Sequence, residues 1–213
     1  MLRLEPRFLT NRSERQALHM DDKLILRAES YLELELLEEG HAAELFELID
    51  ANREYLKKWL PWLDNNRYQQ NTIDFITYSR KQFKESVSLT LAIMYRGKIA
   101  GVIGFHKVDW LNHSTSIGYW LGEDYQGKGI ITKSCEALME YGFGSLGFNR
   151  IEIRCAPGNS RSRAVPERLG LVEEGTLREA EWLYDHYVDH VIYSMLRKDW
   201  NPGGEYKNPP ASG

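Results

Sequence analysis

Apolar residues recur along this chain with two different periods, and the period separates strands from helices. Short apolar or alternating segments, typical of strands, occupy residues 24–27, 32–37, 89–95, 99–105, 114–121, 150–155, 171–178 and 187–196. Helical spacing of three or four occupies residues 41–60 and 72–83, a segment through Cys135, Leu138 and Gly142, and a stretch that ends near Leu169-Gly170. Strands and helices interleave, so the pattern predicts a mixed α/β fold.

One pair of predicted strands is joined by the tight turn Arg96-Gly97-Lys98. Such a short connection joins antiparallel neighbours, so residues 89–105 are predicted to form a hairpin. The helix predicted over 41–60 stops at Pro61, and two indoles, Trp59 and Trp62, lie beside that proline.

The length and composition fit one domain with one sizeable core. The chain has 213 residues, of which 42% are hydrophobic and 27% charged. The folded domain is expected over residues 21–200. Residues 1–20 are expected to be an N-terminal extension, since His19-Met20 resembles a junction left by cloning, and residues 201–213 are expected to be a flexible tail rich in Pro and Gly.

Charge and cysteine usage exclude several classes of protein. The 27 Lys and Arg residues against 31 Asp and Glu residues give a net charge of −4, which argues against direct nucleic-acid binding as the main function. No apolar run approaches the roughly 18 residues of a membrane span, so no membrane partner is expected. Two cysteines and no histidine pair at metal-ligand spacing predict a cytoplasmic protein without a metal.

The segment from Leu121 to Thr132 carries the strongest chemical signal. It leads from a predicted strand into a predicted helix, and its glycines allow backbone N–H groups to face outward at the helix N-terminus, where phosphate binds. Gly122, Gly127 and Lys128 also fit the start of a nucleotide-binding P-loop. That motif fails because Gly129 stands where a Ser or Thr should hold magnesium. A turn that only starts a helix is the structural alternative.

The spacing Gln126-x-x-Gly129 resembles the acetyl-CoA pyrophosphate loop of the GCN5-related N-acetyltransferases (GNAT), although Ile131 stands where that family has Gly or Ala. Gly118-Tyr119-Trp120-Leu121, Asn149-Arg150-Ile151 and the run 159–170 resemble the RimJ/RimL branch, the ribosomal-protein N-terminal acetyltransferases. The resemblance extends over residues 24–200. Its motifs in this order are more specific than any one of them.

The resemblance implies the GNAT fold: a central, mostly antiparallel mixed sheet that is splayed at its middle and flanked by helices. It implies acetyl-CoA as cosubstrate, and relatives of this kind are often homodimers. The residues that it assigns to the cofactor are Trp120, Leu121, Gln126, Gly127, Lys128, Gly129, Ile130, Ile131 and Asn159. Five arginines between Arg150 and Arg168 form a basic cluster that is expected to attract the phosphates of coenzyme A.

Acetyl transfer from a thioester to an amine needs a base for the amine and an acid for the departing thiolate. The resemblance implies Glu181 as the base and Ser162 as the acid, with direct attack in a ternary complex. A surface carboxylate and a helix cap are the structural alternatives, and His186 is an alternative base. Cys135 and Cys155 continue apolar faces and are predicted to be core residues rather than acyl carriers.

The acceptor is predicted from proton energetics. Deprotonating an α-amine at pH 7 costs about 1 kcal/mol, whereas deprotonating a lysine costs about 4 to 5 kcal/mol. One carboxylate base therefore suits an α-amine, such as the N-terminus of a ribosomal protein. Trp59, Trp62 and Tyr184 are candidate acceptor-binding residues, with a role as core anchors as the alternative. Polyamine-like or aminoglycoside-like acceptors, a non-catalytic acetyl-CoA sensor and an RNA-binding protein stay as alternatives.

Overall fold

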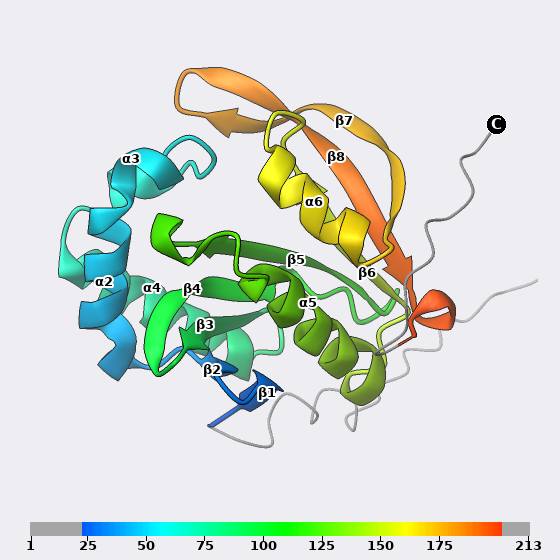
Figure 1. Cartoon of the computed structure of the whole chain (residues 1–213), viewed down its shortest axis with the longest axis horizontal. Coiled ribbons are helices and arrows are strands. Elements are labelled where there is room, and N and C mark those ends of the chain that lie inside the picture. Colours follow the sequence, from blue (N-terminus) through cyan, green and yellow to red (C-terminus); the bar gives the residue numbers. More distant parts are fainter. Residues whose placement is uncertain (1–22, 202–213) are drawn as a thin grey trace, which may run out of the picture.

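The computed structural model describes residues 23–201, and Figure 1 shows their arrangement. The predicted extension over residues 1–20 and the predicted tail, apart from Asn201, lie outside the described residues.

Within the described residues, eight strands form one mixed sheet in the order β1-β2-β3-β4-β5-β6-β8-β7. All neighbouring strands are antiparallel except β5 and β6, which are parallel. The strands are β1 (Ile25–Glu29), β2 (Leu32–Leu36), β3 (Leu89–Tyr95), β4 (Lys98–Phe105), β5 (Ser114–Leu121), β6 (Arg150–Cys155), β7 (Val172–Leu183) and β8 (His186–Leu196).

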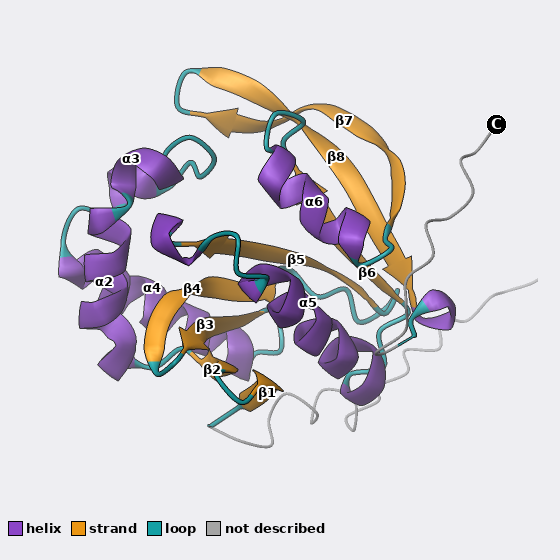
Figure 2. Ribbon diagram, viewed as in Figure 1, coloured by secondary structure: helices purple, strands orange, loops and turns teal. Residues whose placement is uncertain are grey.

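Helices lie on both faces of this sheet (Figure 2). They are α2 (Ala42–Ala51), α3 (Arg53–Leu56), α4 (Gln69–Lys84), α5 (Ile130–Glu140) and α6 (Ser160–Arg168). The predicted α/β class, with a mostly antiparallel mixed sheet flanked by helices, is confirmed.

Two hydrophobic clusters hold the helices to the sheet. The alternation of strand side chains divides them, because successive residues point to opposite faces. Ala92 and Val102 pack with α2 and α4 in one cluster. Ile93 and Ile103 pack with α5 and the C-terminal strands in the other. Cys135 and Cys155 are buried in this second cluster, as predicted.

The single helix predicted over 41–60 is wrong: the chain breaks between α2 and α3 at Asn52. The Asn52 side chain makes two hydrogen bonds at this break. Its Nδ2 donates to the Leu48 carbonyl (2.8 Å), and its Oδ1 accepts from the Glu123 amide (2.8 Å). The break therefore ties α3 to the glycine-rich loop after β5.

Two other boundaries differ from prediction. The helix expected to run through Gly142 changes at Tyr141–Ser145 to a π-helical turn, where Gly142 fits because a Cβ there would lie 2.9 Å from Ile151 and Phe105. The strand expected over 171–178 continues to Leu183, with register irregularities on the way. Glu181, expected between two strands, therefore lies within β7.

The two parallel strands diverge half-way along their length, and this splay defines the centre of the molecule. The ladder between β5 and β6 runs from the pair Ser114–Arg150 to the pair Ile117–Ile153 and then stops. Beyond it, β5 stays paired with β4 and β6 stays paired with β8. An opening between Gly118–Leu121 and Arg154–Cys155 results.

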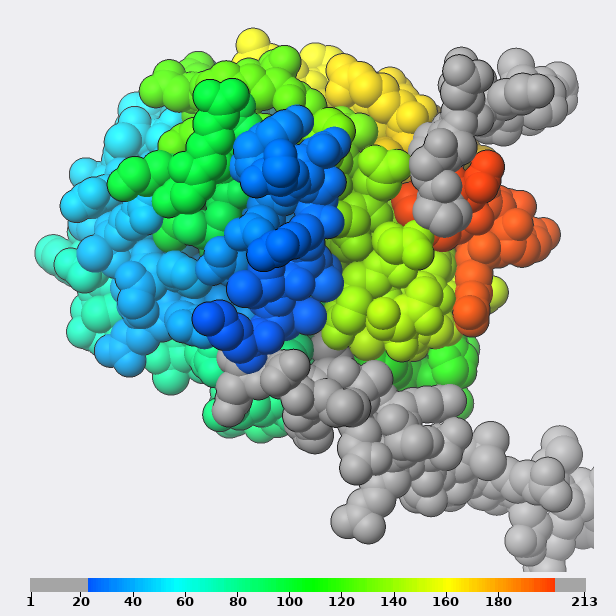
Figure 3. Space-filling view, turned by 60° about the horizontal axis from the view of Figure 1, so that its bottom comes forward, coloured from blue at the N-terminus to red at the C-terminus, as the bar shows by residue number. Residues whose placement is uncertain are grey.

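The N-terminal strands β1 and β2 form one edge of the sheet. In the space-filling view of Figure 3, β1 and β2 lie beside α5. Lys133 of α5 forms an ion pair with Glu29 of β1. This ion pair holds the first turn of α5 against β1. The glycine-rich loop leads into that turn. Among the described helices, none is long and apolar enough to cross a membrane.

An ion-pair network joins the C-terminal strands and predicts acid sensitivity. Arg150 on β6 donates to Glu174 on β7 (2.7 Å), and the Ser194 hydroxyl on β8 donates to the same carboxylate (2.7 Å). The Arg150 hydrogen bond is the larger cause that lowers the pKa of Glu174 from its ordinary value of 4.5 to about 2.

Because the pKa is lowered by folding, the stability from Glu174 is fully present above pH 4.5 and is lost as the pH falls toward 2. The Glu174 side chain is 40% exposed, so screening limits this contribution to roughly 1 kcal/mol. We expect Glu174→Gln to flatten the loss of unfolding free energy in this pH window, measured by urea denaturation. An unchanged slope in the variant would contradict this assignment.

Candidate active site

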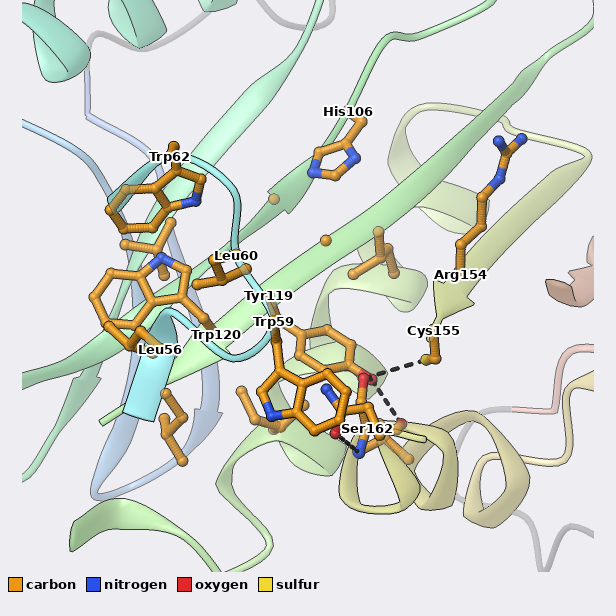
Figure 4. A pocket seen from close by; sticks show the side chains of 18 of the residues that line it. Leu56, Trp59, Leu60, Trp62, His106, Tyr119, Trp120, Arg154, Cys155 and Ser162 are labelled. Atoms are coloured by element: carbon orange, nitrogen blue, oxygen red, sulfur yellow. Dashed lines mark hydrogen bonds between the residues drawn. The ribbon is translucent and has the colours of Figure 1, made fainter. Parts of the chain in front are cut away.

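One long pocket of about 2100 Å³ crosses the molecule at the splay between β5 and β6. The glycine-rich loop and the N-terminus of α5 line one end. Tyr119 of β5, Cys155 of β6 and Ser162 of α6 line the middle, and Glu181 of β7 and the aromatic residues after α3 line the far end. Figure 4 shows the middle and the far end.

The glycine-rich loop presents free backbone donors to this pocket. Gly127 and Gly129 have φ of 70° and 72°, and Gly129 is the N-cap of α5. A Cβ at either glycine would meet nothing within 4 Å, so the backbone conformation, rather than crowding, favours glycine here. Within residues 23–201, the amides of residues 127–132 donate to no protein acceptor. This is a site for an anion at a helix N-terminus.

Side chains around the loop connect both walls of the pocket mouth. Gln126 donates to the Tyr55 hydroxyl of α3 and accepts from Arg161 of α6. Lys128 turns away: its Nζ donates to the Asp124 carbonyl (2.7 Å) and lies 5.6 Å from the centroid of the Tyr125 ring. Lys128, one of the predicted cofactor residues, is not among the residues that line the pocket. Ile130 and Ile131 begin α5 and line the pocket.

The predicted basic cluster is mostly neutralised. Arg150 and Arg154 form ion pairs with Glu152, and Arg163 pairs with Glu173. The two remaining members, Arg161 and Arg168, line the pocket and form no ion pair with any described residue. Within this cluster, the positive charge without an ion pair thus lies on α6, beside the loop.

Three groups meet at the middle of the pocket. The Ser162 hydroxyl donates to the Tyr119 hydroxyl (3.2 Å), and the Cys155 thiol lies 3.2 Å from Ser162 Oγ. The Tyr119 hydroxyl donates to the Ser162 carbonyl (3.0 Å). Burial raises the pKa of Tyr119 well above its ordinary value and also raises the pKa of Cys155. Tyr119 and Cys155 therefore keep their protons near neutral pH.

The helix cap lies one turn away from the predicted place. Asn159 is the N-cap of α6, and its Oδ1 accepts from the Ser162 amide (3.1 Å). The alternative role for Ser162, a helix cap, is therefore wrong, and its hydroxyl is free to face Tyr119. Asn159, which is predicted to contact the cofactor, lines the pocket, and its side-chain oxygen is engaged in capping.

Glu181 reaches the far end of the pocket and has a histidine partner. Its Oε2 lies 3.3 Å from Nε2 of His190 on β8, and both side chains are partly buried. His186, the alternative base, lies instead beside the hairpin turn, is 61% exposed, and pairs with Asp185 at 2.7 Å. It is not among the residues that line the pocket. The imidazole beside Glu181 belongs to His190, which the sequence pattern did not single out.

The predicted aromatic residues divide between the pocket and its frame. Trp59 and Trp62 line the pocket, and Trp62 packs against Trp120 with ring centroids 6.1 Å apart (Figure 4). Tyr184 does not line it. Its hydroxyl donates to the Leu60 carbonyl (2.6 Å), which ties the β7–β8 turn to the segment after α3. Tyr184 thus supports the pocket without facing it.

Comparison with known proteins agrees with this geometry. A family model described as an acetyltransferase (GNAT) domain matches residues 31–172. The chain belongs to the GNAT acetyltransferase family. It is an N-acetyltransferase that uses acetyl-CoA, and the resemblance seen in the sequence is confirmed.

Its relatives include enzymes named for ribosomal proteins. YdaF of Bacillus subtilis, a putative ribosomal N-acetyltransferase, is 36% identical over 82% of this chain and 96% of its own length. The ribosomal-protein-serine acetyltransferase of Escherichia coli is 30% identical over 80% of this chain and 96% of its own. The solved structure of the microcin self-immunity acetyltransferase MccE, in complex with acetyl-CoA and AMP, has a TM-score of 0.76 at 33% identity and covers 79% of this chain and 94% of that one.

Two features of the pocket suit acetyl-CoA as the cosubstrate. The free amides at the start of α5 suit a diphosphate, and the unpaired edge of β5 from Gly118 to Leu121 suits an extended amide-containing arm. No group of three or more His, Cys, Asp or Glu side chains in the described part of the chain is arranged to hold a metal ion.

Proposed function

We propose that this acetyltransferase acetylates the N-terminal α-amine of a protein, with a ribosomal protein as the acceptor. Glu181 carries this proposal. It is a carboxylate at the far end of the pocket, held by His190, where an amine can enter beside the aromatic residues after α3. The names of the relatives, which refer to ribosomal proteins, support the acceptor class.

Acetyl-CoA supplies the acetyl group as a thioester. We propose that the amides of residues 127–131 hold its diphosphate, with Gln126 and Arg161 beside them, and that the backbone of Trp120 and Leu121 pairs with its extended arm. Asn159 is proposed to contribute its side-chain Nδ2, since its Oδ1 caps α6 and its backbone amide and carbonyl are bonded to Ala156 and Arg163.

Glu181 is proposed as the base that takes a proton from the incoming ammonium group. An α-ammonium group near pKa 8 is within reach of such a base, whereas a lysine costs about 3 to 4 kcal/mol more at pH 7. His190 is proposed to orient the carboxylate through the 3.3 Å contact.

Ser162 is proposed as the acid that transfers its hydroxyl proton to the departing sulfur and recovers one from solvent. Tyr119 hydrogen-bonds this hydroxyl and, since burial raises the pKa of Tyr119, stays a neutral partner across the working pH range. Trp59 and Trp62 are proposed to contact the acceptor.

A panel of acceptors tests the function. Peptides with free N-termini, the same peptides with blocked N-termini and an internal lysine, and a polyamine are each incubated with acetyl-CoA. Release of free thiol is followed, and the acetylated nitrogen is located by tandem mass spectrometry. We expect acetylation of the free N-termini. Transfer only to lysine or polyamine would assign a small-amine or side-chain acceptor, and tight acetyl-CoA binding without thiol release would indicate a sensor.

We also propose action in the cytoplasm, where ribosomal proteins are made, as a homodimer. Both follow from the resemblance to the RimJ/RimL branch. Light scattering coupled to size-exclusion chromatography tests the dimer, because a single species at the mass of one 24.8 kDa chain would contradict it.

A further inference from the structure

Two opposed glycines leave the sheet floor bare at the acceptor end of the pocket. Thr90 on β3 pairs with Gly104 on β4, which pairs with Gly118 on β5. By the alternation of strand side chains, this row faces the same side of the sheet as Ala92 and Val102, the side covered by α2 and α4. Thr90, Gly104 and Gly118 all line the pocket.

The imidazole of His106 lies over one of these glycines. A Cβ at Gly118 would lie 2.1 Å from His106 Nε2 and 2.4 Å from its Cε1, so only glycine leaves room for the ring there. The His106 backbone is fully used, since its amide donates to the Ser116 carbonyl (2.8 Å) and its carbonyl accepts from the Thr115 hydroxyl (3.3 Å). This pairing holds the His106 backbone, and the ring lies against Gly118.

The ring itself makes no hydrogen bond to any residue of the described part of the chain. The side chain is exposed within the pocket lining, and the partial desolvation there lowers the pKa of His106, with the nearby charge of Arg154 acting in the same direction and that of Glu181 opposing it. The imidazole is therefore neutral near pH 7, with one nitrogen that donates and one that accepts. A neutral ring without a partner, facing a pocket, is available to a ligand.

The pocket lining locates the ring relative to the reaction. His106, Arg154 and Glu181 all line the same pocket, and Figure 4 shows His106 and Arg154 in its wall. Ser116 lies two residues before Gly118 on β5, on the same face, and lines the pocket. Thr90, His106 and Ser116 around the two bare glycines form a small bay of neutral polar groups, which we call the polar bay.

We propose that the polar bay receives the side chain of the acceptor's first residue, and that His106 forms a hydrogen bond with a hydroxyl group on it. The inference rests on the proposed function, because an α-amine held at Glu181 carries its own side chain one carbon away. Thr90, His106 and Ser116 carry no charge that would pair with a basic side chain, and Glu181, a carboxylate of the same pocket, is assigned to the α-amine. Because its groups can form hydrogen bonds with a hydroxyl, the bay favours N-terminal serine or threonine over alanine.

Two peptides that differ only in the first residue, serine or alanine, test the inference. For the unaltered protein we expect kcat/KM to favour the serine peptide by about 10-fold or more, because a site built for a hydroxyl leaves its own polar group unpaired with alanine. In His106→Leu the ratio should fall to within about 2-fold through loss on the serine peptide. His106→Gln, which keeps a donor and an acceptor, should keep part of the preference.

His186→Leu is the matched control, because it makes the same change at an exposed histidine beside the hairpin turn, and it should keep the unaltered ratio. An equal ratio in His106→Leu and the unaltered protein, or a preference for alanine, would overturn the role of His106 while leaving the proposed function intact. Failure of both peptides to be acetylated, with normal acetyl-CoA binding, would instead remove the proposed function and this inference with it.

Discussion

Replacing Glu181 by Gln is expected to lower kcat for transfer to a peptide α-amine by about 10² or more, with the Kd for acetyl-CoA unchanged. The amide keeps the size of the side chain and a contact to His190, but it cannot take a proton. Raising the pH supplies more neutral amine without help from the enzyme. The deficit of Glu181→Gln should therefore shrink toward pH 9, and a pH series of steady-state rates checks this.

Glu179→Gln provides the matched control. Glu179 is two residues away in the same strand, has a positive φ and is outside the pocket lining, with its amide bonded to Asp189. It should turn over like the unaltered protein. A deficit of Glu181→Gln that is equally large at every pH would show that the carboxylate acts through structure or binding rather than as a base.

Replacing Gly129 by Val is expected to raise the Kd for acetyl-CoA by about 10² or more. The branched side chain would enter the open space in front of the amides at the start of α5, where a Cβ now meets nothing within 4 Å. Loss of two charge-assisted hydrogen bonds to the diphosphate, each worth about 1.5 to 3 kcal/mol, gives this magnitude. Isothermal titration with coenzyme A measures it directly.

The backbone strain of this variant needs its own control, because Gly129 has a φ of 72°. Gly97 in the β3–β4 turn has a φ of 74° and equally open surroundings, but it is not among the residues that line the pocket. Gly97→Val should show a similar loss of thermal stability with unchanged affinity for coenzyme A. If both variants lost affinity equally, strain rather than the loop would be the cause.

Local sequence patterns predicted the strand, glycine-rich loop and helix from Leu121 to Thr132. The strand before Gly122, the glycines of the loop and the helix after them are contiguous, and the glycines have the backbone angles that the pattern predicts. The splay between β5 and β6 was reached only through the resemblance. It depends on how far a parallel ladder between residues 114–117 and 150–153 extends, which no local pattern encodes.

The acceptor end could not be predicted in the same way, because it depends on long-range register. Three residues of β7, 178–180, face the single residue Asp189 between the pairs Leu177–His190 and Glu181–Val188. This bulge brings Glu181 to His190. Spacing along the chain cannot show the bulge, and it therefore favoured His186, which is nearer to Glu181 in sequence. The position of the His106 ring likewise depends on a neighbouring strand, because only a glycine at position 118 leaves room for it.

A crystal structure with coenzyme A and a serine-initiated peptide tests the central claim most directly. The account predicts diphosphate oxygens within hydrogen-bond distance of the amides of residues 127–131, and the peptide's terminal nitrogen beside the Glu181 carboxylate. Coenzyme A bound away from the splay, or a peptide amine remote from Glu181, would contradict it.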